Sequence, residues 1–266
     1  MATTFKAYLI HCITNLHAGS GDSNYGIIDK MVQRDPVTSY PTIHASSLKG
    51  GLREHFENNP TLKSQVDAIF GKEGKNGMDS ESGSHRFLNA DLLALPVRCT
   101  HKQFVYGIDH KLVEFINAKS NTILKKAIFK IDVSESEDFL FGSSTSEVYA
   151  EDYKLKVQTY QEPFNFKQEL ITNQFATLQT SNFETIVKNL PVIARNRVGE
   201  NKNLWYEEIV PHQTLFITFI GTSDTNTDFN KALTTELIQI GANASVGYGL
   251  CRFYEIKFLE TKTNAE

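Results

Sequence analysis

The chain has 266 residues with a formal net charge of -4, and 40% of them are hydrophobic and 22% charged, as in ordinary soluble globular proteins. The acidic balance counts against a free-standing nucleic-acid binder, which usually carries a basic excess, but it allows binding through a local basic strip. No apolar stretch reaches bilayer length, we see no secretion signal, and the three cysteines match no disulfide or metal motif, so we expect a cytoplasmic protein.

The first part of the chain predicts a strand, a loop and a helix. Residues 5–14 are rich in β-formers and alternate, which predicts a strand. Residues 15–25 contain glycines and predict a loop. Residues 46–56 predict a helix with serines at its N-cap and three apolar side chains on one face. The apolar residues are Leu48, Leu52 and Phe56. Two glycines inside this helix are most useful where another segment approaches the backbone closely.

The remaining chain predicts mainly strands. Residues 86–99 read as a buried strand, and residues 191–211 read as two strand-like runs around a turn, which predicts a β-hairpin. Residues 213–220 predict another strand, residues 228–240 an amphipathic helix, and residues 250–258 a final strand.

This order predicts an α+β fold with a ferredoxin-like, RRM-type βαββαβ core that long insertions divide. The open face of such a sheet is a common platform for RNA. We expect a single domain, 1–266, with its core at about 1–56, 86–106 and 213–258, insertions at about 57–85 and 107–190, and the hairpin at about 191–211.

Two segments in the first part of the chain carry side chains suited to phosphate chemistry. His17 and Asp29 flank a glycine-containing loop, and such a pair can serve acid–base chemistry at a phosphate. The alternative is an ordinary turn with a solvated aspartate. The start of the helix at residues 46–56 carries hydroxyls and cations that suit phosphate oxygens, or it is simply a capped surface helix. Its candidate residues are Ser46, Ser47, Lys49 and Arg53.

Two later segments are also candidates for RNA contact. Residues 241–252 form a glycine-rich stretch whose backbone amides can approach phosphates closely, or a generous turn. The hairpin at residues 191–211 interleaves cations with aromatics, which suits nucleic acid, or it is an ordinary hairpin with a buried tryptophan. Glu207 and Glu208 adjoin it and either complete a cation or proton-transfer site or form a solvated strand end. The candidate RNA-binding residues of these segments are Arg195, Arg197, Trp205, Gly247, Tyr248, Gly249 and Arg252.

Read together, these segments resemble the RAMP superfamily of CRISPR proteins. The blocks GIIDKMVQRD, YPTI and SSLKGGLR resemble the N-terminal part of that superfamily, and residues 241–252 resemble its glycine-rich loop. The blocks DLLALPVR, LPVIAR and LWYEE resemble the backbone subunit of type III-B (Cmr) effector complexes in particular.

The resemblance implies a guide-RNA-binding backbone subunit whose hairpin at residues 191–211 is a thumb. Copies of it stack along a guide RNA with other Cmr subunits, and the complementary target RNA is cut at regular intervals in antiviral defence. It also implies Mg²⁺ or another divalent metal. Carried over to this sequence, the catalytic and metal-binding residue is Asp29, and His17 is a second catalytic candidate. The alternatives are a non-catalytic guide-RNA scaffold and the type III-A backbone counterpart.

Overall fold

The computed structural model describes residues 3–21, 26–72, 80–131, 133–142, 144, 147–166, 175–197, 203–222 and 227–259. The chain divides into two compact units, Met1–Leu92 with Val187–Glu255, and Leu93–Ile186 with Ile256–Glu266. The elements mix helices with parallel and antiparallel strands, so the predicted α+β class is confirmed. The single-domain boundaries stay a prediction. In the described part of the chain, no helix is long and apolar enough to cross a membrane.

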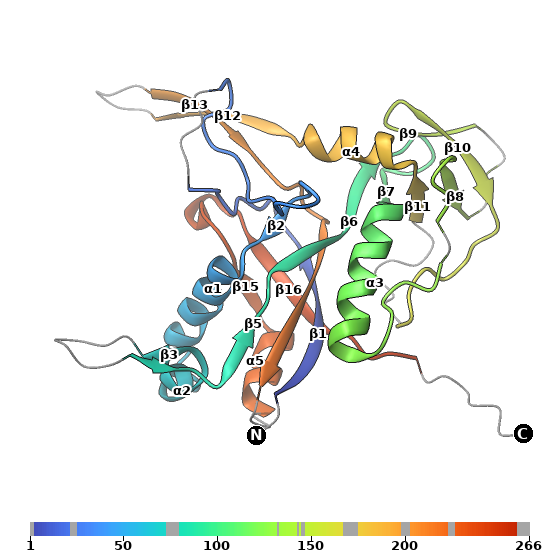
Figure 1. Cartoon of the computed structure of the whole chain (residues 1–266). Helices are drawn as coiled ribbons and strands as arrows, with labels where there is room; N and C mark the ends of the chain where they lie inside the picture. Colours follow the sequence, from blue (N-terminus) through green and yellow to red (C-terminus); the bar gives the residue numbers. More distant parts are fainter. Residues whose placement is uncertain are drawn as a thin grey trace, which may run out of the picture. The chain divides into compact units, whose positions relative to one another are not determined.

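The first unit contains a sheet of antiparallel strands (Figure 1). Its central strand β1 (Thr4–Cys12) pairs on one side with β14 (Leu215–Thr222) and on the other with β16 (Leu250–Glu255). β15 (Leu237–Gln239) pairs with β16, and β5 (His85–Phe87) pairs with β14. The short strand β2 (Thr42–Ile43) pairs with the start of β6 (Ala90–Arg98). Fully buried side chains of this sheet include Leu9, Ile10, Phe216, Phe219 and Phe253. The strands expected at residues 5–14, 213–220 and 250–258 are therefore confirmed.

The first helix, α1 (Ala45–Asn58), buries Leu48, Leu52 and Phe56, which is the apolar face predicted from the sequence. A Cβ atom at Gly51 would lie 2.9 Å from the carbonyl oxygen of Gln239. Gly51 therefore permits the close approach that the sequence suggested, whereas a Cβ at Gly50 would meet nothing within 4 Å. The smaller elements that follow are η1 (Lys63–Gln65), α2 (Val66–Phe70), β3 (Gly71–Lys72) and β4 (Glu81–Ser82).

Two expectations about helix ends are wrong. The N-cap of α1 is His44, without a side-chain cap hydrogen bond, so the serines lie inside the first turn. The second helix, α5 (Thr227–Thr235), is shorter than the expected 228–240, because Leu237–Gln239 pairs with β16 as a strand. Pairing with β16 satisfies the backbone groups of these residues in place of helical hydrogen bonds, and local periodicity does not reveal it.

The expected hairpin is confirmed as a separate two-stranded ribbon of β12 (Val192–Arg197) and β13 (Asn203–Glu208). Figure 1 shows it extending away from β1, β14 and β16. Its register pairs Arg195 with Trp205 and Ile193 with Glu207, so these four residues share one face of the ribbon. The expected turn at residues 199–203 falls mostly outside the described residues.

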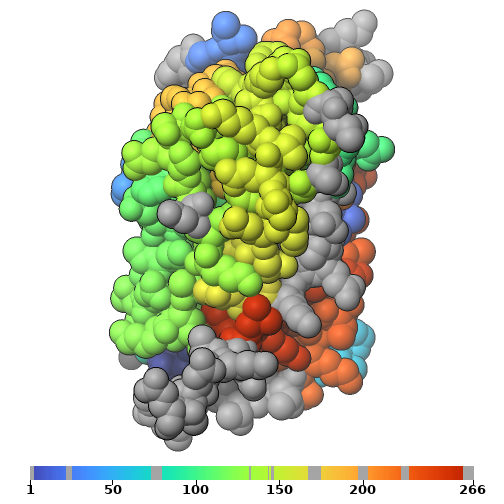
Figure 2. Space-filling model, turned by 90° about the vertical axis from the view of Figure 1, so that its right-hand side faces the viewer, coloured from blue at the N-terminus to red at the C-terminus, as the bar shows by residue number. Residues whose placement is uncertain are grey.

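The second unit has a mixed sheet. Its strands are β6 (which begins in the first unit), β7 (Phe104–Asp109), β8 (Phe139–Phe141), β9 (Val148–Ala150), β10 (Tyr153–Gln158) and β11 (Phe175–Leu178). β11 is parallel to β7, and β10 is parallel to β8. The expected strand at 86–99 is thus two strands, β5 and β6. The helix α3 (His110–Leu124) belongs to this unit, and α4 (Thr180–Lys188) leads out of it. Green and yellow residues of this unit cover much of the face in Figure 2.

Candidate functional site

Asp29 lies on the edge of β13, close to the base of the hairpin. Its backbone N–H donates to the carbonyl oxygen of Tyr206 at 3.0 Å, and its carboxylate oxygen Oδ2 accepts the Tyr206 N–H at 2.7 Å. The residue is exposed. Within the described residues Oδ1 takes part in no hydrogen bond, so this oxygen is available as a base or a metal ligand.

Glu208 fastens the segment after Asp29 to β13. Its backbone N–H donates to the carbonyl oxygen of Lys30 at 2.9 Å, and its Oε2 accepts the N–H of Val32 at 3.0 Å. Its Oε1 forms an ion pair with Arg34 at 2.5 Å, and its side chain is only 2% exposed. The position of Asp29 is therefore fixed on both sides by β13, through Tyr206 and through Glu208.

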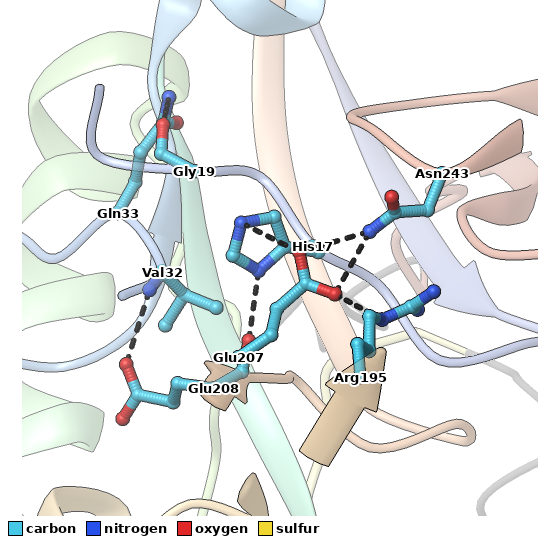
Figure 3. Close-up of polar contacts among 8 residues, drawn as sticks. All are labelled: His17, Gly19, Val32, Gln33, Arg195, Glu207, Glu208 and Asn243. Atoms are coloured by element: carbon cyan, nitrogen blue, oxygen red, sulfur yellow. Dashed lines mark hydrogen bonds and ion pairs between the residues drawn. The ribbon is translucent and has the colours of Figure 1, made fainter. Parts of the chain in front are cut away.

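A second buried carboxylate, Glu207, gathers three side chains from distant parts of the chain (Figure 3). Its Oε2 is 2.5 Å from the Arg195 guanidinium, and the amide of Asn243 donates to both of its oxygens at 3.0 and 3.1 Å. The Nε2 atom of His17 lies 3.5 Å from its Oε1. The interpretation of Glu207 and Glu208 as a solvated strand end is thus wrong, because both are 1% exposed.

His17 is buried within this cluster rather than presented to solvent. Its Nδ1 lies 2.8 Å from the carbonyl oxygen of Glu208. A carbonyl only accepts, so Nδ1 must carry a proton and donate it. Nε2 then faces the Glu207 carboxylate at 3.5 Å. This geometry suits a residue that supports the loop; direct catalysis by His17 stays a prediction.

The start of α1 is connected to the glycine loop by Gln33. Its side-chain amide donates to the carbonyl oxygen of Gly19 at 3.0 Å and to the hydroxyl of Ser47 at 2.7 Å, and its Oε1 accepts the N–H of His44 at 2.7 Å. Ser46 and Lys49 are exposed on the same helix. The predicted phosphate-binding end of α1 therefore presents two of its four candidates to solvent.

Arg53, by contrast, is engaged within the protein. It donates to Glu57 at 2.7 Å, to the carbonyl oxygen of Gly71 at 2.7 Å and to Asp67 at 3.3 Å. These partners belong to α1, α2 and β3. Arg53 therefore has a structural role that requires no RNA, because its contacts join three elements.

The glycine-rich stretch closes over His17. The N–H of Ala242 donates to the carbonyl oxygen of His17 at 2.9 Å, and a Cβ at Gly241 would lie 2.6 Å from that oxygen. Gly249 has φ +75° and lies against the carbonyl oxygen of Ile240, whereas Gly247, with φ +79°, faces open space. Of the two candidate glycines, Gly247 is thus the one whose surroundings admit a close neighbour such as RNA.

The hairpin cations and aromatics pair with one another. The guanidinium of Arg195 stacks 4.5 Å from the ring centroid of Tyr248 while it neutralises Glu207. The ammonium of Lys30 lies 5.2 Å from the ring centroid of Trp205. Trp205 is half-buried rather than fully buried. The side chain of Arg197 lies outside the described residues.

Arg252 lies in β16 opposite His11 in β1. His11 is buried, and its Nε2 lies 2.8 Å from Oε1 of Gln213. Burial lowers the pKa of His11; the hydrogen bond with Gln213 opposes this change, and the nearby charges of Arg252 and His212 add to it. The structure therefore places Asp29 and His17 against β13 of the hairpin, whereas Arg252 lies in β16 opposite His11.

Sequence reasoning missed Lys30, Gln33, Arg34 and Asn243. Three of them stand inside the block KMVQRD that follows Asp29, so a closer reading of that block would have found them. No local signal identifies Asn243, because its partner Glu207 is 36 positions away.

The fit of a divalent metal can be examined at Asp29. No group of three or more His, Cys, Asp or Glu side chains arranged to hold a metal occurs among the described residues. Mg²⁺, however, is commonly bound through one or two carboxylates together with phosphates and water. The exposed Asp29, whose Oδ1 takes part in no hydrogen bond among the described residues, fits that mode. A closed site made only of protein ligands does not fit the described residues.

Comparison with known proteins gives near-full-length matches. A model of the RAMP superfamily matches residues 9–252. The chain is 26% identical over 294 residues to the CRISPR system Cmr endoribonuclease Cmr4 of Pyrococcus furiosus, covering 97% of this chain and 98% of the relative. It is 24% identical over 297 residues to the CRISPR system CMR subunit Cmr4 of Saccharolobus solfataricus, covering 93% and 95%.

Solved structures with a similar fold include a chain of the type III-B Cmr-beta complex in its apo state, with a TM-score of 0.76, 22% identity and coverage of 96% of this chain and 98% of that one. Another is oligomeric Cmr4 from Pyrococcus furiosus, with a TM-score of 0.72, 20% identity and coverage of 96% and 99%. At these identities the similarity shows a shared fold.

Proposed function

Because the chain belongs to the RAMP superfamily, we propose that it is the guide-RNA-binding backbone subunit of a type III-B CRISPR (Cmr) effector complex and that it cleaves the target RNA paired to the guide. The observation that carries this proposal is the placement of Asp29. Its exposed carboxylate accepts the Tyr206 N–H and its backbone N–H donates to the Tyr206 carbonyl oxygen, which holds Asp29 at the base of a projecting hairpin. The near-full-length similarity to the Pyrococcus furiosus Cmr4 endoribonuclease supports the same function.

The proposed chemistry is attack of a ribose 2′-hydroxyl on the neighbouring phosphate. Asp29 accepts the hydroxyl proton on Oδ1, since Oδ2 is occupied by the Tyr206 N–H. The clamp from β13 restricts the carboxylate to one orientation, which lowers the entropic part of the barrier. The contacts of His17 with Glu207 and with the Glu208 carbonyl oxygen connect the glycine-containing loop to β13.

Asp29 has an alternative role in this proposal: instead of accepting the proton, Oδ1 would be a ligand of Mg²⁺ or another divalent metal that also binds the RNA phosphates. When bound, it would stabilise the charge that develops on the phosphate. Asp29 is the residue that would hold the metal in this chain, with water and phosphate oxygens as the remaining ligands.

Guide RNA would be bound through its backbone, because the guide sequence changes while the protein does not. Lys49 and Ser46 at the start of α1 and the open Gly247 turn are the exposed candidates for these contacts. With a net charge of -4, a single copy lacks the basic excess of a strong RNA binder. Stacking of many copies on one guide, together with other Cmr subunits, would supply the affinity by multivalency.

We assign a ferredoxin-like core to the first unit as part of the same proposal. The strand order β16–β1–β14–β6, with α1 between β1 and β6 and α5 between β14 and β16, supports it. The β12–β13 ribbon would then be the thumb that enters the guide–target duplex. A cytoplasmic location follows from the proposed assembly with guide RNA.

The test uses the complex reconstituted with guide RNA and partner subunits, with labelled complementary RNA as substrate. Asp29→Asn is the decisive variant, because an amide oxygen can still accept the Tyr206 N–H while its basicity is lost. We expect evenly spaced products from the wild type with Mg²⁺, and cleavage at least about 100-fold slower in Asp29→Asn or with EDTA, with target binding retained. Equal cleavage by Asp29→Asn would refute the catalytic assignment. Target binding without spaced cleavage by the wild type would identify a guide-RNA scaffold instead.

A further inference from the structure

Lys30 directly follows Asp29, and its side chain is held in place. Both residues are exposed. A lysine on a surface loop normally samples many rotamers. Here the ammonium lies 5.2 Å from the centroid of the Trp205 ring, a cation–π contact that favours one orientation.

The backbone of Lys30 is fixed as firmly as that of Asp29. The N–H groups of both residues donate to the same carbonyl oxygen, that of Tyr206, at 3.0 and 3.1 Å, and the Lys30 carbonyl accepts the N–H of Glu208 at 2.9 Å. Lys30 thereby forms a parallel bridge with Glu207 of β13. The backbone that carries Asp29 and Lys30 is thus tied to β13 at both residues.

Lys30 also differs in its charge balance from Arg34 and Arg195, the other cations whose partners lie in β13. Arg195 is neutralised by Glu207, and Arg34 by Glu208, in each case at 2.5 Å. Lys30 has no acidic partner within 4.0 Å among the described residues, and its neighbour is an aromatic ring. Its positive charge is therefore available to an anion that approaches Asp29.

We propose that Lys30 is a further catalytic residue that binds a non-bridging oxygen of the scissile phosphate, with Trp205 as the residue that positions it. The inference rests on the proposed function. The 2′-oxygen bonds to phosphorus as its proton passes to Asp29, the bond from phosphorus to the 5′-oxygen breaks, and the departing 5′-oxygen takes a proton from water. Negative charge grows on the non-bridging oxygens in the transition state, and a fixed ammonium stabilises it there more than in the ground state.

The test uses the reconstituted complex with guide RNA, with single-turnover cleavage and target affinity measured separately. Lys30→Met should slow cleavage about 100-fold, the effect of removing one preorganised donor. Lys30→Arg is the matched control, since it retains charge and ring contact, and should stay within about tenfold of the wild type. Trp205→Leu should give an intermediate rate, because the ammonium remains but is no longer held.

A single phosphorothioate at the scissile phosphate distinguishes contact from mere support. One of its two diastereomers should slow the wild type, and this sulfur effect should shrink in Lys30→Met because the contact is already absent. Unchanged cleavage in Lys30→Met would overturn this proposal. So would equal losses in Lys30→Met and Lys30→Arg with an undiminished sulfur effect. In either case, cleavage by the wild type would leave the proposed function standing. Absence of cleavage in the wild type would overturn both.

Discussion

Replacement of Glu207 by glutamine tests how much the buried cluster contributes to the first unit. Glutamine keeps the volume and one acceptor oxygen but removes the charge opposite Arg195, which lies 2.5 Å away with its side chain 18% exposed. The new amide also places a donor against the amide donor of Asn243. Removal of one partner from a buried pair typically costs about 3–5 kcal/mol. Since Arg195 retains some solvent, we expect a loss of about 3 kcal/mol in the free energy of unfolding.

The assay is urea denaturation followed by tryptophan fluorescence. Trp205 is the one tryptophan in the sequence and stands two positions before Glu207, so its emission reports this neighbourhood. With a slope of about 3 kcal/mol per molar urea, the midpoint should fall by about 1 M.

The matched control is Glu57→Gln, which makes the same change in an exposed pair with Arg53 on α1. Exposed helical pairs contribute about 0.3–0.5 kcal/mol, so this variant should scarcely move the midpoint. Arg195→Met should cost much less in the Glu207→Gln background than alone, because the charge it pairs with is already gone. If Glu207→Gln lost less than about 1 kcal/mol, the buried carboxylate would not organise the cluster as we argue.

The remaining predictions concern a glycine turn, a buried histidine and the guide contact. Gly249→Ala should destabilise the first unit by well over about 1 kcal/mol, because its Cβ would lie 2.0 Å from the Ile240 carbonyl oxygen. Gly247 has a similar positive φ but faces open space, so Gly247→Ala should cost only about 1 kcal/mol. Because burial lowers the pKa of His11, the folded state binds fewer protons than the unfolded state. Stability should therefore fall as pH drops from above about 6.5 through the folded-state pKa, and less so in His11→Gln, by urea titration at each pH. Lys49→Glu should weaken guide binding for every guide sequence and reduce its salt dependence, measured by filter binding at several salt concentrations.

Each of these has a result that contradicts it. Equal midpoints for Gly249→Ala and Gly247→Ala would mean that the Ile240 contact relaxes freely. If the free energy of unfolding falls equally at low pH in His11→Gln and in the wild type, other groups cause the pH dependence. If Lys49→Glu leaves guide affinity unaltered, Lys49 makes no specific phosphate contact. The same conclusion holds if a charge reversal at exposed Lys231 lowers guide affinity equally.

The sequence by itself determined the elements whose signal is local. Alternation along residues 5–14 and the spacing of Leu48, Leu52 and Phe56 predicted β1 and the buried face of α1, and both are confirmed. The hairpin was predicted from its two runs and its turn residues. Such patterns can be recognised in the sequence because the periodicity of a helix or strand determines which of its side chains face the core.

Only the tertiary structure decided which charged residues are free. Arg53 and Arg195 read as RNA contacts in the sequence, yet both are paired with carboxylates. Glu207 and Glu208 read equally well as a solvated end, yet both are buried. The physical reason is that a charge is buried only where partners converge on it, and the backbone of Glu208 meets His17 from 191 positions away. The chain pattern shows which charges are present, and the fold determines which of them remain for the RNA.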